Sequence, residues 1–266
     1  MMSSNEAPVI SARDLRVQYA DREILHGINF EVKARETMVI LGGSGSGKST
    51  LLRTMVGLEK PTSGSVWVGG TNLATASAAE MDAVRKRIGL SFQGGALIGS
   101  MTVGENIALP LREHTDLEES TIEVIVRIKL RQVGLIKFEH FMPSELSGGM
   151  KKRAAVARAM AMDPEILFFD EPSAGLDPVT AAGIDQLILN LKQALGVTII
   201  VVTHDLASAF LIADRILVLD AGNILNIASP EELKQSTHPR IRQFLNRVPD
   251  SEAGEDVDNL QLFTDS

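Results

Sequence analysis

Apolar and polar positions alternate with a period of two in the first part of the chain. Ile28, Phe30 and Val32 are separated by polar residues, and the same alternation surrounds Val66 and Val68. A period of two places successive side chains on opposite faces of a strand. These segments therefore predict short strands with one buried face.

Three further runs are apolar with little interruption, at residues 37–41, 166–169 and 197–202. Such runs are typical of parallel strands that are covered on both faces. Residues 177–195 lie between the second and third runs and predict a helix that crosses from one strand to the next. Strands that alternate with helices indicate an α/β fold with a parallel central sheet.

Other segments have the spacing of helices. Residues 50–57 predict a helix that ends at a glycine, and residues 118–133 carry apolar side chains at helical intervals. Residues 150–162 are rich in small side chains, which permit close packing of a helix. A basic helix end at 85–87 precedes a strand-like segment at 88–92.

A glycine-rich loop joins the strand at 37–41 to the helix at 50–57. Glycines let backbone N–H groups converge on phosphate oxygens, and the helix that follows directs its positive end at them. We expect Lys48 to pair with the β- and γ-phosphates of ATP and Ser49 to bind Mg²⁺ through its hydroxyl. The loop reads Gly42-Gly43-Ser44-Gly45-Ser46-Gly47-Lys48-Ser49, followed by Thr50.

Two adjacent carboxylates end the apolar run at 166–169. Burying the charges of Asp170 and Glu171 at the end of a buried strand costs free energy, so we expect these residues to have a partner or a chemical role. We expect Asp170 to hold Mg²⁺ through water and Glu171 to act as the base, or orienting group, for an attacking water. The alternative is an Asp-Glu-Pro turn that only closes the strand.

Three single residues follow or end predicted strands. Gln93 closes the strand at 88–92 and is able to contact both Mg²⁺ and water. His204 follows the run at 197–202, where ligands of open α/β sheets bind, and we expect it to contact the γ-phosphate. Tyr19 is the only tyrosine and either stacks on adenine or packs on the sheet.

A second phosphate-seeking turn, Ser147-Gly148-Gly149, precedes the helix at 150–162. Its N–H groups suit a γ-phosphate. Because the loop at 42–49 already holds the chain's own nucleotide, this turn is expected to serve a nucleotide bound to another subunit. The basic residues at 151–153 oppose the helix dipole, which predicts contact with an anion or acidic partner, or else a solvated basic face.

Charge and composition narrow the class of protein. The chain has no cysteine, which excludes disulfides and thiolate metal sites. Its start has no signal-peptide pattern, and no apolar run reaches the roughly 20 residues that span a bilayer, so we expect any membrane role to act through a partner. Net charge is −8, of which −6 lies in residues 248–266, and no basic face suits nucleic acid. The tail contains one apolar cluster, residues 260–263, that could dock.

As a set, these motifs resemble those of ABC transporter ATPases, over roughly residues 8–235. The resemblance implies a P-loop ATPase core with an antiparallel N-terminal β-subdomain and an inserted helical subdomain, at about 95–160, that carries the signature. The ATPase domain is expected at 8–247 and an acidic tail at 248–266. By resemblance, Tyr19 stacks on adenine, residues 42–50 form the Walker A loop, and Gln93 is the Q-loop glutamine. Residues 146–150 are the signature, and Asp170 and Glu171 form Walker B with the catalytic carboxylate. Ser173 to Asp177 is the D-loop, and His204 is the switch histidine.

The resemblance is narrower at residues 92–114, 143–150 and 239–245. There the chain is similar to the ATPases of Mla-type, Mce-associated phospholipid transporters, including the signature that ends in Met150. This implies a head-to-tail dimer beneath an MlaE-type permease at the cytoplasmic face of the inner membrane. It also implies an Mce-domain (MlaD-like) protein and, in many members, a STAS-domain (MlaB-like) subunit, in a system that maintains the lipid asymmetry of the envelope. Residues 94–114 lie where such ATPases receive the permease.

Three alternatives follow from the same residues. The first is the ATPase of an importer for a polar solute such as an amino acid. The second is an ABC protein acting on DNA or ribosomes, which the single cassette and the short segment between Gln93 and Leu146 disfavour. The third is a non-catalytic scaffold, which is disfavoured because Lys48, Glu171 and His204 are all present.

Overall fold

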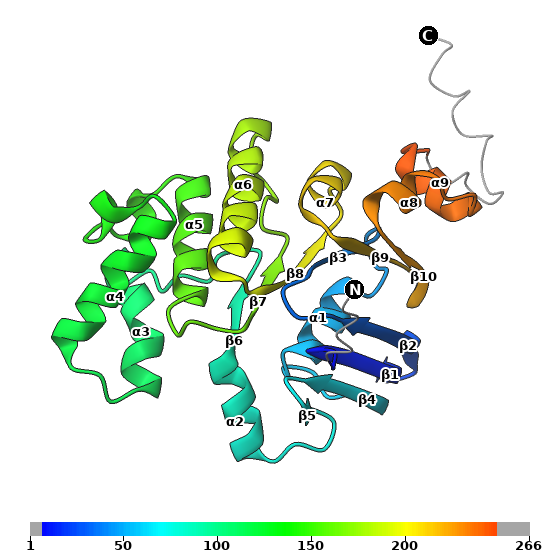
Figure 1. Ribbon diagram of the computed structural model, residues 1–266, viewed down its shortest axis with the longest axis horizontal. Helices are drawn as coiled ribbons and strands as arrows, with labels where there is room; N and C mark the ends of the chain where they lie inside the picture. The colour runs from blue at the N-terminus through cyan, green and yellow to red at the C-terminus, as the bar shows by residue number, and fades with distance from the viewer. Residues whose placement is uncertain (1–6, 249–266) are drawn as a thin grey trace, which may run out of the picture.

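The computed structural model describes residues 7–248, which form two sheets and the helices around them (Figure 1). The smaller sheet has the order β2-β1-β4-β5, and each of its neighbouring pairs is antiparallel. The predicted antiparallel N-terminal subdomain is therefore confirmed. Its strands are β1 (Ile10–Tyr19), β2 (Arg22–Val32), β4 (Ser63–Val68) and β5 (Thr71–Asn72).

The larger sheet is the predicted parallel core, with the order β10-β9-β3-β8-β7-β6. The five strands from β9 to β6 run parallel, whereas β10 pairs antiparallel with β9. A tight turn joins β9 to β10, with Ala221 at φ 42° and Gly222 at φ 75°. The strands are β3 (Thr37–Leu41), β6 (Ile88–Ser91), β7 (Ile166–Asp170), β8 (Thr198–Thr203), β9 (Arg215–Asp220) and β10 (Asn223–Ala228).

One helix fills the space between the two sheets. Helix α1 (Lys48–Met55) buries Leu51 and Met55 completely, in a cluster that also holds Ile40 of β3 and Leu15 of β1. Residues Val39 and Leu41, on the other face of β3, belong to a second cluster. Both faces of the parallel sheet are therefore covered, as continuous apolar strands require.

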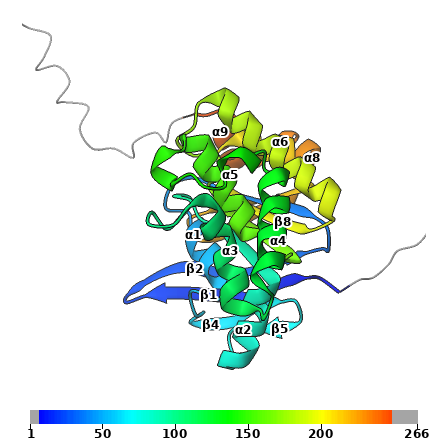
Figure 2. The same ribbon diagram turned by 90° about the vertical axis from the view of Figure 1, so that its left-hand side faces the viewer.

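The second cluster is covered by a layer of helices (Figure 2). Helices α3, α4 and α5 stand together at one side of the sheets, and α6 and α7 lie beside them (Figure 1). Side-chain caps fix several starts, such as the Thr102–Glu105 box of α3 and Asp177 before α6. The helices are α2 (Ala78–Arg87), α3 (Val103–His114), α4 (Glu119–Gln132), α5 (Gly148–Ala159), α6 (Pro178–Leu195), α7 (Leu206–Ile212), α8 (Pro230–Lys234) and α9 (Pro239–Leu245), with short 3-10 turns Ile136–Phe138 and Pro143–Glu145.

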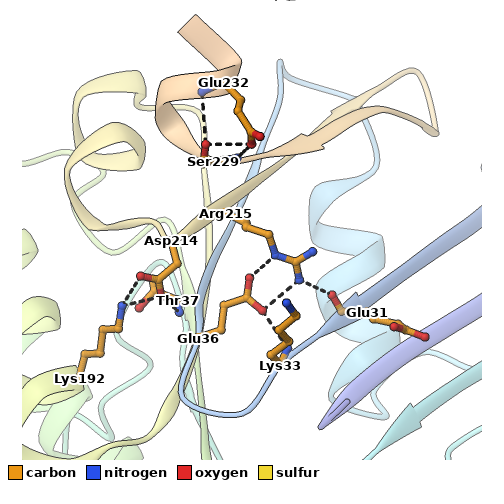
Figure 3. A network of polar contacts seen from close by, with 9 residues as sticks. All are labelled: Glu31, Lys33, Glu36, Thr37, Lys192, Asp214, Arg215, Ser229 and Glu232. Carbon is orange, nitrogen blue, oxygen red and sulfur yellow. Dashed lines mark hydrogen bonds and ion pairs between the residues drawn. The ribbon is translucent and has the colours of Figure 1, made fainter. Parts of the chain in front are cut away.

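A polar network ties the two sheets together at the amino ends of the core strands (Figure 3). The guanidinium of Arg215 donates to both carboxylate oxygens of Glu36, at 2.5 and 3.0 Å, and to the carbonyl of Glu31 on β2. Asp214 accepts from the backbone N–H of Thr37 at 2.7 Å and from Lys192 of α6. These contacts fix β3, β9, β2 and α6 relative to one another.

The predicted elements differ from the observed ones mainly at their ends. Helix α1 begins at Lys48 rather than at residue 50, and α5 begins at Gly148 rather than at residue 150. Strands β9 and β10 and helices α7, α8 and α9 were not expected as elements. Within residues 7–248 no helix is long and apolar enough to cross a membrane. The apolar cluster at 260–263 lies outside the described residues.

Candidate nucleotide site

The residues singled out in the sequence gather at one edge of the parallel sheet. Strands β3, β6, β7 and β8 run parallel, so their carboxyl ends meet there. The glycine loop follows β3, Asp170 ends β7 and Glu171 follows it, His204 follows β8, and Gln93 comes two residues after β6. This edge is where ligands of open α/β sheets bind.

The glycine loop folds around its own lysine. Lys48 is 8% exposed, and its ammonium donates to the carbonyls of Gly42 and Gly43, each at 2.8 Å. Burial lowers the pKa of Lys48, while the nearby carboxylates of Glu171 and Asp170 act to raise it. The lysine is thus a largely desolvated cation at the start of a helix, which favours a multiply charged anion.

The backbone of the loop also fits a phosphate. No atom lies within 4 Å of where a side chain would begin at Gly43 or Gly45, so the backbone is open there. The hydroxyl of Ser46 is buried and has no hydrogen-bond partner among residues 7–248. At Gly42, by contrast, a Cβ would lie 2.2 Å from the carbonyl of Leu219, which only glycine permits.

The two carboxylates have different surroundings. Burial raises the pKa of Asp170, the neighbouring charge of Glu171 raises it further, and the cations Arg53, Lys152 and Lys48 oppose these effects. Glu171 has a backbone φ of 47°, in the left-handed region that costs a non-glycine residue free energy. Its backbone N–H donates to the carbonyl of Val202 at 2.8 Å.

His204 is in direct contact with Glu171. Its Nδ1 lies 2.8 Å from Oε1 of Glu171, and the hydroxyl of Thr203 donates to Oε2 at 3.3 Å. The hydroxyl of Thr203 in turn accepts from the backbone N–H of Asp205 at 3.0 Å. The carboxylate of Glu171 is therefore oriented by two residues from the end of the next strand.

Tyr19 ends β1 beside helix α1. Its hydroxyl donates to Glu59 at 2.8 Å and lies close to Thr50, and 40% of the residue is exposed. Burial and the hydrogen bond to Glu59 raise the pKa of Tyr19. Its exposed ring adjoins the helix that follows the glycine loop. Its two predicted roles, stacking on adenine and packing on the sheet, both stay predictions.

The Ser147 turn opens helix α5, and the hydroxyl of Ser147 accepts from the backbone N–H of Met150 at 3.3 Å. A Cβ on Gly149 would lie 2.4 Å from Cγ2 of Thr180, so the turn is packed against the start of α6. Within residues 7–248, no hydrogen bond or ion pair links this turn to the loop at 42–50.

Two residues at the site were missed by sequence reasoning. Sequence reasoning grouped Lys152 with a basic face directed at an anion, a partner or solvent, and did not expect contacts within the chain. Its ammonium donates to the backbone carbonyls of Gln93 and, at 3.1 Å, of Glu171. Arg158 donates to the carbonyls of Ala96, at 2.7 Å, and Gly95, at 3.0 Å. A lone arginine among small apolar residues was the available signal for Arg158, whereas Lys152 had none.

The C-terminal helix also borders the site. A cavity of about 520 Å³ lies between the Glu171–His204 pair and α9, and it is lined on that side by Phe244, Arg247 and Val248. The sequence marked residues 239–245 only through resemblance. The structure shows that this helix forms one wall of the space next to the paired side chains.

The residues proposed for Mg²⁺ are Ser49, Gln93 and Asp170. In the described part of the chain no group of three or more His, Asp or Glu residues could hold a metal ion. Mg²⁺ commonly takes one or two protein oxygens together with phosphates and waters. A hydroxyl, an amide and a carboxylate fit that donor set.

Comparison with known proteins places these features in context. Residues 25–174 match the family model described as ABC transporter. The chain is 41% identical over 249 residues to the intermembrane phospholipid transport system ATP-binding protein MlaF of Escherichia coli K12, covering 94% of this chain and 93% of that protein. It is also 41% identical over 237 residues to the probable ribonucleotide transport ATP-binding protein mkl of Mycobacterium leprae, covering 89% and 68%.

A solved structure has the same fold. The ATP-binding cassette MJ0796, a dimer in a post-hydrolysis state with bound ADP and Pi, superimposes with a TM-score of 0.76 at 31% identity. The match covers 83% of this chain and 98% of the cassette.

Proposed function

Because this chain belongs to the ABC transporter family and is an ATPase, we propose that it drives phospholipid transport through a membrane permease. The ATPase domain spans residues 8–247, with a helical subdomain at about 95–160, and residues 248–266 are an acidic tail. Transport is powered by binding and hydrolysis of ATP at the edge of the parallel sheet.

The contact between Glu171 and His204 is the observation that carries the catalytic assignment. Glu171 accepts a proton from, or orients, the attacking water, and His204 holds that carboxylate and contacts the γ-phosphate. Lys48 neutralises charge on the β- and γ-phosphates, and Tyr19 stacks on adenine. Gln93 would contact both the metal and the water.

Mg²⁺, held by Ser49, Gln93 and Asp170, would neutralise phosphate charge when bound. The raised pKa of Asp170 fits this role, because the desolvated carboxylate gains from a nearby cation. The protein's part is to keep these oxygens at the same strand edge as the glycine loop.

The Ser147 turn supports a head-to-tail dimer. It precedes a helix start, where the first N–H groups have no carbonyl of their own helix to bind. Within the described residues no hydrogen bond or ion pair joins it to the glycine loop of its own chain. Each ATP lies between residues 42–50 of one chain and residues 147–149 of the other. The solved relative MJ0796, which is dimeric and holds ADP and Pi, supports a dimer.

The phospholipid assignment rests on similarity along almost the entire chain. The relative named for intermembrane phospholipid transport matches 94% of this chain. The implied partners are an MlaE-type permease, an Mce-domain (MlaD-like) protein and a STAS-domain (MlaB-like) subunit, at the cytoplasmic face of the inner membrane. Residues 94–114, which include α3, are the segment offered to the permease.

A second candidate is the ATPase of an importer for a polar solute. The equal identity to a relative named for ribonucleotide transport favours it. That match covers a smaller share of the relative than the match to the phospholipid protein does.

Purification of the Glu171→Gln protein with its membrane partners separates the two candidates. The complex is extracted in detergent, and proteins and lipids are identified by mass spectrometry. Recovery of an MlaE-type permease, an Mce-domain protein and bound phospholipid is expected. Recovery of a solute-binding protein with a different permease would contradict the phospholipid assignment and leave the ATPase assignment intact.

A further inference from the structure

Helix α5 carries two cations that end on the backbone of other segments. Lys152 donates to the carbonyls of Gln93 and Glu171, and Arg158 donates to those of Gly95 and Ala96. Both side chains reach away from α5 towards the strand ends. Four backbone carbonyls that belong to the nucleotide edge are thus held by one helix.

Two of the residues held in this way have unfavourable backbone conformations. Glu171 and Ala96 both have φ of 47°, in the left-handed region. A non-glycine residue in this region costs of the order of 1–3 kcal/mol and persists only where its surroundings hold it. The carbonyl of Glu171 accepts from Lys152, and the carbonyl of Ala96 accepts from Arg158. The two cations therefore bind the carbonyls of the residues whose backbone conformation is unfavourable, Glu171 and Ala96.

The cations are themselves partly withdrawn from water. Burial lowers the pKa of both Lys152 and Arg158, and the carboxylates of Asp170 and Glu171 oppose this for Lys152. A desolvated cation is stable only with well-placed acceptors. The carbonyls supply them, so each contact stabilises both the cation and the strained peptide.

Helix α5 packs closely against neighbouring elements at both of its ends. At its start, a Cβ on Gly149 would lie 2.4 Å from Thr180 of α6. At its end, a Cβ on Gly89 of β6 would lie 2.1 Å from the carbonyl of Ala159. The approach at Gly89 is to backbone, which only glycine permits, and the two contacts show that α5 packs closely against α6 and β6.

We propose that Lys152, assisted by Arg158, is a positioning residue that couples helix α5 to the catalytic carboxylate of the same chain. The helix presents the Ser147 turn at its start and holds Glu171 and residues 93–96 through its side chains. The part of the inference that concerns a partner's nucleotide rests on the proposed dimer. A nucleotide that displaces α5 through Ser147 thereby changes the geometry of the carboxylate that acts on the chain's own ATP.

Steady-state ATP hydrolysis by the full-length chain, purified with its permease, tests Lys152. Lys152→Met is expected to lower kcat by about ten- to hundred-fold, because small displacements of a catalytic group have effects of this size. The KM for ATP is expected to stay within about two-fold, since the carbonyls that Lys152 binds belong to Gln93 and Glu171 and not to the glycine loop. Lys152→Arg, which keeps a cation, recovers part of kcat.

Lys151→Met is the matched control. It removes the same charge one residue earlier on the same helix, and the side chain of Lys151 makes no hydrogen bond or ion pair within residues 7–248. Its kcat is expected to stay within about two-fold of the wild-type value. The proposal would be overturned if the kcat of Lys152→Met also stayed within about two-fold of the wild-type value, or if only its KM changed.

Hydrogen–deuterium exchange of the nucleotide-free protein gives a second readout that needs no activity. Peptides covering 93–97 and 171–175 are expected to exchange faster in Lys152→Met than in Lys151→Met. Arg158→Lys is expected to loosen residues 95–97 alone. Equal exchange in the two methionine variants would refute the positioning role. Phospholipid transport that does not depend on Glu171 would contradict the proposed function. The positioning role of Lys152 would still be tested by the exchange measurement, which requires no activity.

Discussion

Oε1 of Glu171 lies 2.8 Å from Nδ1 of His204, although the two residues end different strands of the parallel sheet. The contact is possible because β7 and β8 are hydrogen-bonded neighbours in register, with Asp170 opposite Val202. Glu171, the residue that follows β7, therefore lies beside the turn that follows β8. This pairing places a carboxylate and an imidazole beside the glycine loop, where ATP is expected to bind.

Removal of the imidazole is expected to slow ATP hydrolysis. His204→Ala leaves Glu171 with only the Thr203 hydroxyl at 3.3 Å to orient its carboxylate. We expect kcat to fall by about 10²–10⁴-fold, the range of a positioned acid–base group. The measurement is phosphate release at saturating ATP. His140→Ala, an exposed histidine in the helical layer, is the control, and equal rates for the two variants would rule out the assigned role.

The two first glycines of the loop are expected to respond differently to alanine. At Gly42 a Cβ would lie 2.2 Å from the backbone carbonyl of Leu219, so the loop or the end of β9 must shift. At Gly43 nothing lies within 4 Å, so the fold tolerates the methyl group while the phosphate does not. Gly42→Ala should lower Tm, whereas Gly43→Ala should keep Tm and lose nucleotide affinity. Calorimetry measures Tm, and titration with a fluorescent ATP analogue measures nucleotide affinity. Normal affinity of the Gly43→Ala protein would argue against a phosphate bound at the backbone of Gly43.

The network at the amino ends of the strands is expected to contribute to stability. Glu36 is 8% exposed and depends on Arg215 for charge compensation. Arg215→Met leaves a buried carboxylate unpaired, which costs about 3 kcal/mol, equivalent to about 6–12 °C in Tm. Arg13→Met breaks an ion pair between exposed residues and should cost less than about 1 kcal/mol. Thermal unfolding compares the two, and similar losses would show that burial does not distinguish these pairs.

Asp185 makes stability depend on pH. Its Oδ2 accepts from Ser208 at 2.8 Å, whereas its Oδ1 is buried without a partner in the described part of the chain. Burial raises its pKa above the ordinary 3.8, and the charge of Asp205 adds to the rise. Between the ordinary and the raised pKa the folded state binds more protons than the unfolded state, so the contribution of Asp185 to stability falls as pH rises through that window.

Asp185→Asn removes this charge and is expected to raise Tm at pH 7. The gain should shrink as the pH is lowered and vanish below about 3.8, where the aspartate is protonated in both states. Thermal unfolding at several pH values measures the difference. A Tm gain that does not change with pH would show that ionisation of Asp185 is not its cause.

The sequence was most informative where a local pattern implies a fixed geometry. A parallel sheet brings the carboxyl ends of its strands to one edge, so the strand pattern alone predicts that Glu171 and His204 lie near the glycine loop. The chemical roles of these residues stay predictions. What the sequence did not indicate depends on contacts between distant segments.

Strand β10 and Lys152 are examples of such contacts. Ile224, Leu225 and Ile227 do not alternate strictly with polar residues, so β10 has a weak strand pattern, and its partner β9 decides its conformation. Lys152 contacts carbonyls of two other segments only because α5 packs closely against β6 at Gly89. Neither spacing nor residue type predicts a long side chain's direction across such an interface.

Phospholipid movement by the reconstituted transporter tests the central claim most directly. The chain and its permease are placed in vesicles with a fluorescent phospholipid, and lipid movement is followed with ATP for the wild-type and Glu171→Gln proteins. ATP-dependent movement is expected for the wild type and none for Glu171→Gln. Equal lipid movement by both proteins would contradict it.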